Sequence, residues 1–210
     1  MPLNSVLYPW MPIVLSVYEE RYLRMLEDVL AGARVFGTAL IAEGREVGGA
    51  AVPHPVGTEV IVARAWPVDD GSWRVVGIGR HRFRIREVLR QHPYPQAEVF
   101  FAGLGEMHDE DVDADLVREV RELFGEHLSL LLALLSQAGA QPEIPEHPAR
   151  LSYMVAAHLG TGARERQRLL EIPSAAERLE AEIRLLRQDL ARLRFFAAAE
   201  PPRPEPPSLN

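Results

Sequence analysis

The spacing of apolar and polar residues divides the chain into a first half of short strands and a second half of helices. An apolar, strand-like run that breaks at Pro9 and Pro12 leads into an amphipathic helix predicted over residues 19–31. Asp70-Gly71 is a hairpin turn signal. Apolar or alternating runs predict the remaining strands of this half over residues 35–41, 58–68, 73–78, 80–89 and 97–101.

The second half is predicted to be a bundle of helices. Apolar residues at helical spacing predict helices over residues 114–136, 148–159 and 163–171. Ser174 and Glu177 form a capping box that starts the last helix. In this helix, apolar residues recur at steps of four and three: Leu179, Ile183, Leu186, Leu190 and Leu193. Such a stripe is typical of a bundle core, and a homodimer seam is the alternative.

These elements predict an α+β fold in two parts. Several short, mostly antiparallel strands with one inserted helix favour a small, partly closed β-barrel subdomain over residues 1–105. A helical bundle subdomain is expected over residues 106–197. Residues 198–210 are rich in proline and have no apolar pattern, so they are expected to form a disordered tail.

Composition and charge exclude several classes of protein. With 47% hydrophobic residues the chain can bury a core, and its net charge of −7 disfavours binding to nucleic acid or to an anionic membrane. The chain has no cysteine, and none of its 23 basic residues is lysine. These absences exclude a Walker-type phosphate loop, a serine–lysine dyad and a thiolate metal site. No signal peptide or membrane span is evident, so a cytoplasmic location is expected.

No metal or cofactor site is predicted. The seven histidines are scattered and do not have the spacing of metal ligands. Asp109, Asp111 and Asp113 imitate the start of a calcium loop, but Ala114 stands where that loop needs glycine. Val120 likewise replaces the bidentate glutamate. Capping of the helix that follows explains the acidic run better.

The most specific stretch of sequence is VLYPWMPIVLSVYEERY, residues 6–22. It resembles the opening of the N-terminal domain of Lon proteases, and of stand-alone bacterial proteins built from that domain. The matching positions are Leu7, Tyr8, Pro9, Trp10, Met11, Val17, Tyr18, Glu19, Arg21 and Tyr22. Trp10 is a departure, since the family usually has glycine there.

Further matches follow in the order in which the family has them. They include Arg34, Phe36, Gly37, Val56-Gly57-Thr58, Gly79, Arg82, Phe83, Arg84, Pro93, Tyr94, Ala97-Glu98-Val99 and Leu169-Leu170-Glu171. The resemblance implies a pseudo-barrel related to the pseudouridine-synthase and archaeosine-transglycosylase (PUA-like) domain, followed by a helical bundle. It also implies a module that recognises polypeptide substrates. The missing lysines exclude the ATPase and protease chemistry of Lon, so we expect a module that is not an enzyme.

Five residues are candidates for binding unfolded or partner polypeptides. An unfolded chain exposes apolar and aromatic side chains that a folded protein buries, and a surface that binds it is expected to expose such side chains too. They are Trp10, Met11, Pro12, Trp66 and Trp73. For Trp66 and Trp73 the simpler explanation, that they cap the barrel, is favoured. For Trp10 both explanations stand.

An RNA-binding face is the alternative function. Arg80, Arg82, Arg84 and Arg86 occupy every second position, so on a regular strand they share one face. Such a row could contact phosphates, and Trp73 could stack on a base. The acidic net charge disfavours it. An enzyme is the least supported class, because no nucleophile–base pair or phosphate loop is present.

Overall fold

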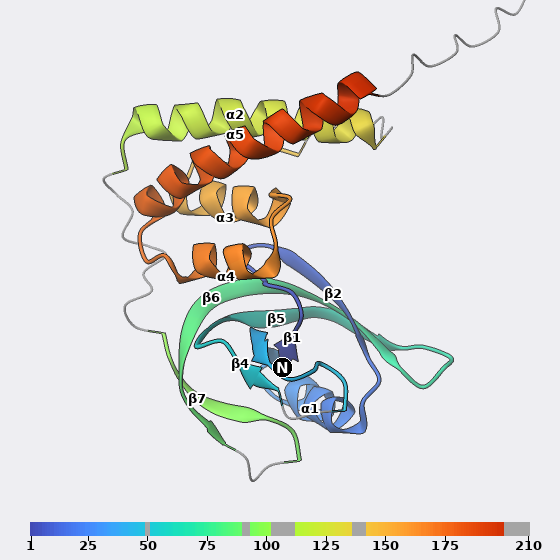
Figure 1. The fold of residues 1–210 in the computed structure, drawn as a ribbon. Coiled ribbons are helices and arrows are strands. Elements are labelled where there is room, and N and C mark those ends of the chain that lie inside the picture. The colour runs from blue at the N-terminus through green and yellow to red at the C-terminus, as the bar shows by residue number, and fades with distance from the viewer. Residues whose placement is uncertain (49–50, 90–92, 102–111, 136–141, 200–210) are drawn as a thin grey trace, which may run out of the picture.

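The computed structural model describes residues 1–48, 51–89, 93–101, 112–135 and 142–199, and these form a strand-rich half beneath a layer of helices (Figure 1). The strands are β1 (Pro2–Leu3), β2 (Pro12–Val17), β3 (Val35–Glu43), β4 (Val52–Pro53), β5 (Val56–Pro67), β6 (Trp73–Leu89) and β7 (Gln96–Phe100). The helices are α1 (Glu20–Ala31), α2 (Ala114–Leu134), α3 (Pro148–His158), α4 (Ala163–Glu171) and α5 (Ala175–Ala199).

The strands form one mixed sheet with the order β1-β3-β5-β6-β2, in which β4 also pairs with β3 and β7 with β6. All pairings are antiparallel except that of β1 with β3. The predicted α+β class is confirmed. The predicted barrel is not, because the pairing of the described strands does not close into a ring. β2 and β7 pair with successive stretches of β6, and neither pairs with β1.

Most of the predicted elements are present close to their expected bounds. Helix α4 begins and ends at the predicted residues, and α1 begins one residue later than predicted. The two strands predicted on either side of Gly79 are one continuous strand, β6. β2 begins at Pro12, where the sequence indicates a break, because proline is tolerated as the first residue of a strand.

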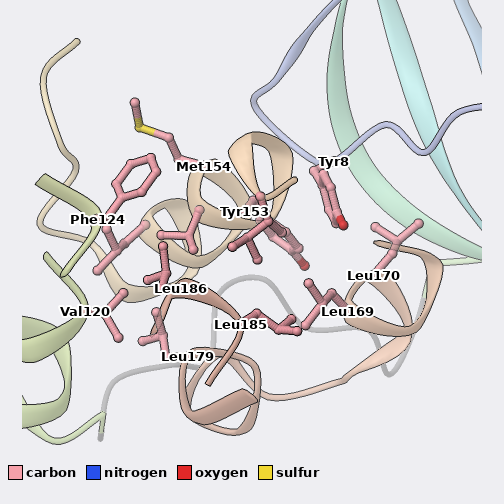
Figure 2. Close-up of a cluster of buried hydrophobic side chains, with 14 of the residues drawn as sticks. Tyr8, Val120, Phe124, Tyr153, Met154, Leu169, Leu170, Leu179, Leu185 and Leu186 are labelled. Carbon is pink, nitrogen blue, oxygen red and sulfur yellow. The ribbon is translucent and has the colours of Figure 1, made fainter. Parts of the chain in front are cut away.

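Each half has its own cluster of buried apolar side chains. The cluster of the strand half includes Val17, Tyr22, Met25 and Val75. The cluster of the helical half includes Phe124, Leu151, Leu169 and Leu186, and also Tyr8 and Val56 from the strand half. Figure 2 shows Tyr8 entering the helical cluster beside Tyr153 and Leu170. The two halves therefore share buried surface.

Hydrogen bonds also join the two halves. The Tyr8 hydroxyl donates to the Arg166 carbonyl oxygen over 2.8 Å, and the Gln167 side-chain amide donates to the Val56 carbonyl oxygen over 3.0 Å. The predicted boundary between residues 105 and 106 lies outside the described residues. Of the predicted tail, residues 200–210 also lie outside them, and α5 continues to Ala199.

The leucine stripe of the last helix lies in the core of the bundle, as predicted. Leu179, Leu186 and Leu190 are buried within this chain, and α5 packs along α2 (Figure 1). These leucines are therefore not exposed as a homodimer seam. Asp113 caps α2, since its carboxylate accepts a hydrogen bond from the Asp115 backbone N–H over 2.9 Å. This capping accounts for the end of the acidic run, while Asp109 and Asp111 lie outside the described residues.

None of the helices in the described part of the chain combines the length and the apolar character that crossing a bilayer requires. Within the same part of the chain, no three histidine, aspartate or glutamate side chains are grouped closely enough to hold a metal ion.

Candidate functional site

Trp10 has an unusual backbone conformation, with a φ of 62°. This left-handed region is strained for residues other than glycine. Two backbone hydrogen bonds hold the segment, from Trp10 N–H to the Gly79 carbonyl and from Gly79 N–H to the Met11 carbonyl. At Gly79 any Cβ would lie 2.2 Å from the Tyr8 carbonyl oxygen, so only glycine allows this close approach.

The ring of Trp10 is half-buried rather than free. It packs against the Tyr153 ring with a centroid distance of 5.8 Å, and the Arg150 guanidinium lies 5.8 Å from the Trp10 ring centroid. Both partners belong to α3. Trp10 therefore joins the strand half to the helical half, and only part of its ring remains available to a ligand.

Replacing Trp10 with glycine should destabilise the protein less than replacing it with alanine. Both variants lose the contact with Tyr153, but only alanine keeps the strain of a positive φ, so we expect a difference of about 1 kcal/mol in the free energy of unfolding. Urea denaturation measures it. Tyr18, an exposed residue without a positive φ, is the control, and there glycine should be the more destabilising replacement. Equal stability of the two Trp10 variants would contradict this explanation.

Three adjacent strands place apolar side chains on one exposed surface. Along β2, Pro12 and Val14 point outward while the alternate residues are less exposed. Ile78 of β6 lies opposite Pro12 on one side and opposite Ile61 of β5 on the other. We call this surface the outer sheet face, and its residues are Pro12, Val14, Ile61, Trp66, Val76 and Ile78.

The outer sheet face contains two of the five residues predicted to bind polypeptides. Pro12 and Trp66 are exposed, with 41% of Trp66 accessible, and the Arg64 guanidinium lies 5.5 Å from the Trp66 ring centroid. Met11 is half-buried and packs against both apolar clusters. Trp73 is half-buried against the cluster of the strand half. The structure therefore divides these candidates into two exposed residues and three that pack within the fold.

The sequence reasoning missed the most exposed apolar residues of this face. Val14 is 60% exposed and Ile78 is 46% exposed. The alternation along residues 12–17 marks Val14 as outward-facing only once the strand is known to begin at Pro12. Ile78 looks like an ordinary core residue of a strand, and nothing in the sequence shows that the helices leave its face uncovered.

The predicted row of four exposed arginines is wrong for Arg82. This side chain is 1% exposed and donates hydrogen bonds to the carbonyl oxygens of Leu170, Ile172 and Pro173 over 2.8, 2.7 and 3.2 Å. It therefore connects β6 to the chain between α4 and α5 and cannot contact RNA. The register of β6 against β5 also shifts between Gly79 and Arg82, which interrupts the expected alternation.

The other three arginines of the row are exposed, and two of them have acidic partners. Arg80 lies 3.7 Å from Glu59, and Arg86 lies 3.5 Å from Glu98. The Arg86 guanidinium also lies 5.8 Å from the Phe100 ring centroid. Pairing with carboxylates therefore accounts for Arg80 and Arg86 without an RNA ligand. Because Arg82 is buried, the four arginines do not form a continuous basic face.

A second apolar surface is a groove of about 420 Å³ bounded by β7 on one side and by residues of β1, β3 and β4 on the other. Ala97 and Val99 of β7, Phe83 of β6 and Met25 and Val29 of α1 line it. Sequence reasoning missed this groove because its lining comes from segments that are distant in the chain. No single stretch carries a signal for it.

Comparison with known proteins identifies the family to which this arrangement of sheet and helices belongs. The family model described as the ATP-dependent protease La (LON) substrate-binding domain matches residues 1–188. The chain belongs to this family. The Lon protease of Dictyoglomus thermophilum is 27% identical over 201 residues, which cover 90% of this chain and 24% of that protein. The Lon protease of Anaeromyxobacter dehalogenans is 26% identical over 185 residues, covering 87% of this chain and 22% of that protein.

Two solved structures have the same fold as this Lon substrate-binding domain chain. The Lon N-terminal domain protein of Xanthomonas campestris matches with a TM-score of 0.66 and 26% identity, covering 86% of this chain and 93% of that one. The N-terminal domain of the Mycobacterium avium complex Lon protease matches with a TM-score of 0.61 and 20% identity, covering 89% and 96%. The chain thus spans about a quarter of the length of the Lon proteases it matches, and the match is to their substrate-binding domain.

Proposed function

We propose that this chain is a non-catalytic module that binds unfolded or partner polypeptides, and that the outer sheet face is its binding surface. The single observation that carries this proposal is the run of exposed apolar side chains across three neighbouring strands, from Val14 through Ile78 to Ile61. Membership of a substrate-binding family supports recognition of substrates.

The chemistry of the outer sheet face suits an unfolded polypeptide. A folded protein keeps most of its large apolar side chains inside, whereas an unfolded one exposes them, so an apolar surface discriminates between the two. The face is strand-like and unoccupied by the helices, which cover the region around Arg82 and Val56 instead. Trp66 adds an aromatic side chain of the kind that dominates binding energy in protein interfaces.

Replacing Val14 and Ile78 together with serine should weaken binding of an unfolded protein about thirtyfold. Each replacement removes an apolar contact worth about 1 kcal/mol at an interface, and folding stability changes less than at a core site because Val14 is 60% and Ile78 46% exposed. Fluorescence anisotropy with a labelled, reduced and carboxymethylated protein, which cannot fold, measures the affinity.

The matched control for this experiment is Leu135→Ser. Leu135 is 57% exposed at the end of α2, away from the sheet, so its replacement should leave binding unchanged. Equal weakening by both sets of substitutions would show that general surface hydrophobicity, rather than the outer sheet face, accounts for the binding. Light scattering on the free proteins tests the remaining alternative, that the face is the contact of a homodimer.

A further inference from the structure

The groove beside β7 lies next to strand edges that have no partner strand in the described residues. β7 pairs with β6 on one side only, and β1 pairs only with β3. Ala97 and Val99 of β7 and Pro2 of β1 all line the groove. An unpaired edge presents a row of backbone N–H and C=O groups that another extended chain can satisfy. Figure 1 shows β7 curving away from β1 and β4, with α1 below them.

The lining of the groove is suited to side chains that alternate along an extended chain. Ala97 and Val99, alternate residues of β7, line it together with Gln96 at the start of the strand, whereas Glu98 pairs with Arg86. Phe83, Met25 and Val29 complete an apolar wall. A volume of about 420 Å³ is within the range of pockets that bind ligands, and it can accept a few apolar side chains.

Glu59 is the only charged side chain among the described residues that line the groove. Its Oε2 atom is buried and makes no hydrogen bond within the described part of the chain, and the nearest arginine nitrogen, Nη1 of Arg80, lies 3.7 Å away. That distance is too long for a direct hydrogen bond. Glu59 thus pairs with Arg80 only at a distance, and 16% of its side chain remains accessible, so the negative charge of the carboxylate can still attract a basic side chain in the groove.

We propose that the groove binds an extended polypeptide segment as an added strand on β7, with apolar side chains at alternate positions and one arginine or lysine directed to Glu59. This inference rests on the proposed function and specifies the kind of segment that is bound. The edge of β7 that has no partner strand in the described residues supplies the affinity that is independent of sequence. The apolar lining and Glu59 supply the selection of side chains.

Peptides of defined pattern test this proposal. The probe is a nine-residue peptide of alternating valine and threonine, with arginine replacing the central valine and both ends neutral. Isothermal titration should show that replacing its arginine with glutamate weakens binding to the protein about tenfold. In the Glu59→Gln variant, which keeps the shape of the side chain, the two peptides should bind within about twofold of each other.

N-methylation of the peptide separates strand addition from simple apolar packing. In a strand, alternate amides point to opposite sides, so methylating the set that faces β7 should weaken binding more than about tenfold, while methylating the other set should have little effect. If both methylated peptides bind as the parent does, the groove holds side chains without adding a strand and the proposal is overturned.

Hydrogen exchange and the outer-face variant complete the test. Binding should slow amide exchange over residues 96–100, whereas protection of both edges of β7 already in the free protein would mean that this chain covers its own edge, which overturns the proposal. The Val14→Ser, Ile78→Ser double variant should bind the peptide normally. Peptide binding that is lost in this variant but unaffected by Glu59→Gln would overturn the groove proposal and leave the proposed function standing.

Discussion

Replacing Arg82 with alanine should lower the free energy of unfolding by about 3–5 kcal/mol, the largest loss we expect from a single substitution in this chain. The guanidinium is 1% exposed and donates to three backbone carbonyls, those of Leu170, Ile172 and Pro173. It also lies 5.6 Å from the Tyr153 ring centroid. Without it, buried carbonyl oxygens lose their donor at the point where the helices meet the sheet. Chemical denaturation followed by circular dichroism measures the loss.

Arg84→Ala is the matched control for Arg82→Ala. It removes the same side chain two residues along the same strand, but Arg84 is exposed, so the change should stay within about 0.5 kcal/mol. Arg82→Lys should give an intermediate loss, because one ammonium group cannot reproduce the geometry of a guanidinium donating to three carbonyls. Similar losses for Arg82→Ala and Arg84→Ala would mean that Arg82 does not have the structural role assigned to it.

The contrast between Arg82 and Arg84 shows how far the sequence could predict this fold. Residue spacing identified a strand over residues 80–89, and the strand is there. Spacing alone also placed all four arginines on one exposed face, because it contains no information on what packs against the strand. The burial of Arg82 depends on the segment between α4 and α5, about ninety residues further along the chain.

The candidate binding surfaces could also be predicted only in part from the sequence. Pro12 and Trp66 were predicted and are exposed, but Val14 and Ile78 were missed because exposure is a property of the packed molecule. Local signals such as helical spacing and caps depend on neighbouring residues, and they placed α1, α4 and α5 well. A face or groove shared by several elements requires the tertiary structure.

The second large effect concerns Glu182, a fully buried carboxyl group in α5. Neither of its oxygens makes a hydrogen bond within the described residues. Burial raises its pKa well above the usual value, and the nearby Arg178 guanidinium only partly opposes this. Arg178 instead donates to the Ser152 hydroxyl and the Ile172 carbonyl, each over 2.8 Å, and lies over the Tyr153 ring. The folded protein therefore accommodates the ionised form of Glu182 poorly.

The raised pKa of Glu182 fixes the direction of a pH effect on stability. Between the pKa of about 4.5 that applies in the unfolded chain and the higher pKa of the folded state, the folded protein binds more protons at this site. Stability therefore falls as pH rises through this window, and the loss is complete above the folded pKa. Glu182→Gln removes the titration, so the variant should gain stability relative to the original protein between pH 5 and pH 8.

The free energy of unfolding of Glu182→Gln should be compared with that of the unsubstituted protein at each pH. The pH dependence of either protein alone also contains a contribution from His127, whose pKa is shifted in the opposite direction. Burial lowers the pKa of His127, more than Asp189 raises it, so protonation of this histidine in acid destabilises both proteins equally. Glu180→Gln, the same substitution at an exposed position on the same helix, is the matched control. If the Glu182→Gln difference did not change between pH 5 and pH 8, the carboxyl group of Glu182 would have to be solvated or paired in the folded protein. The close packing of α5 against α2 and α3 argues against solvation, because it leaves Glu182 with no accessible surface.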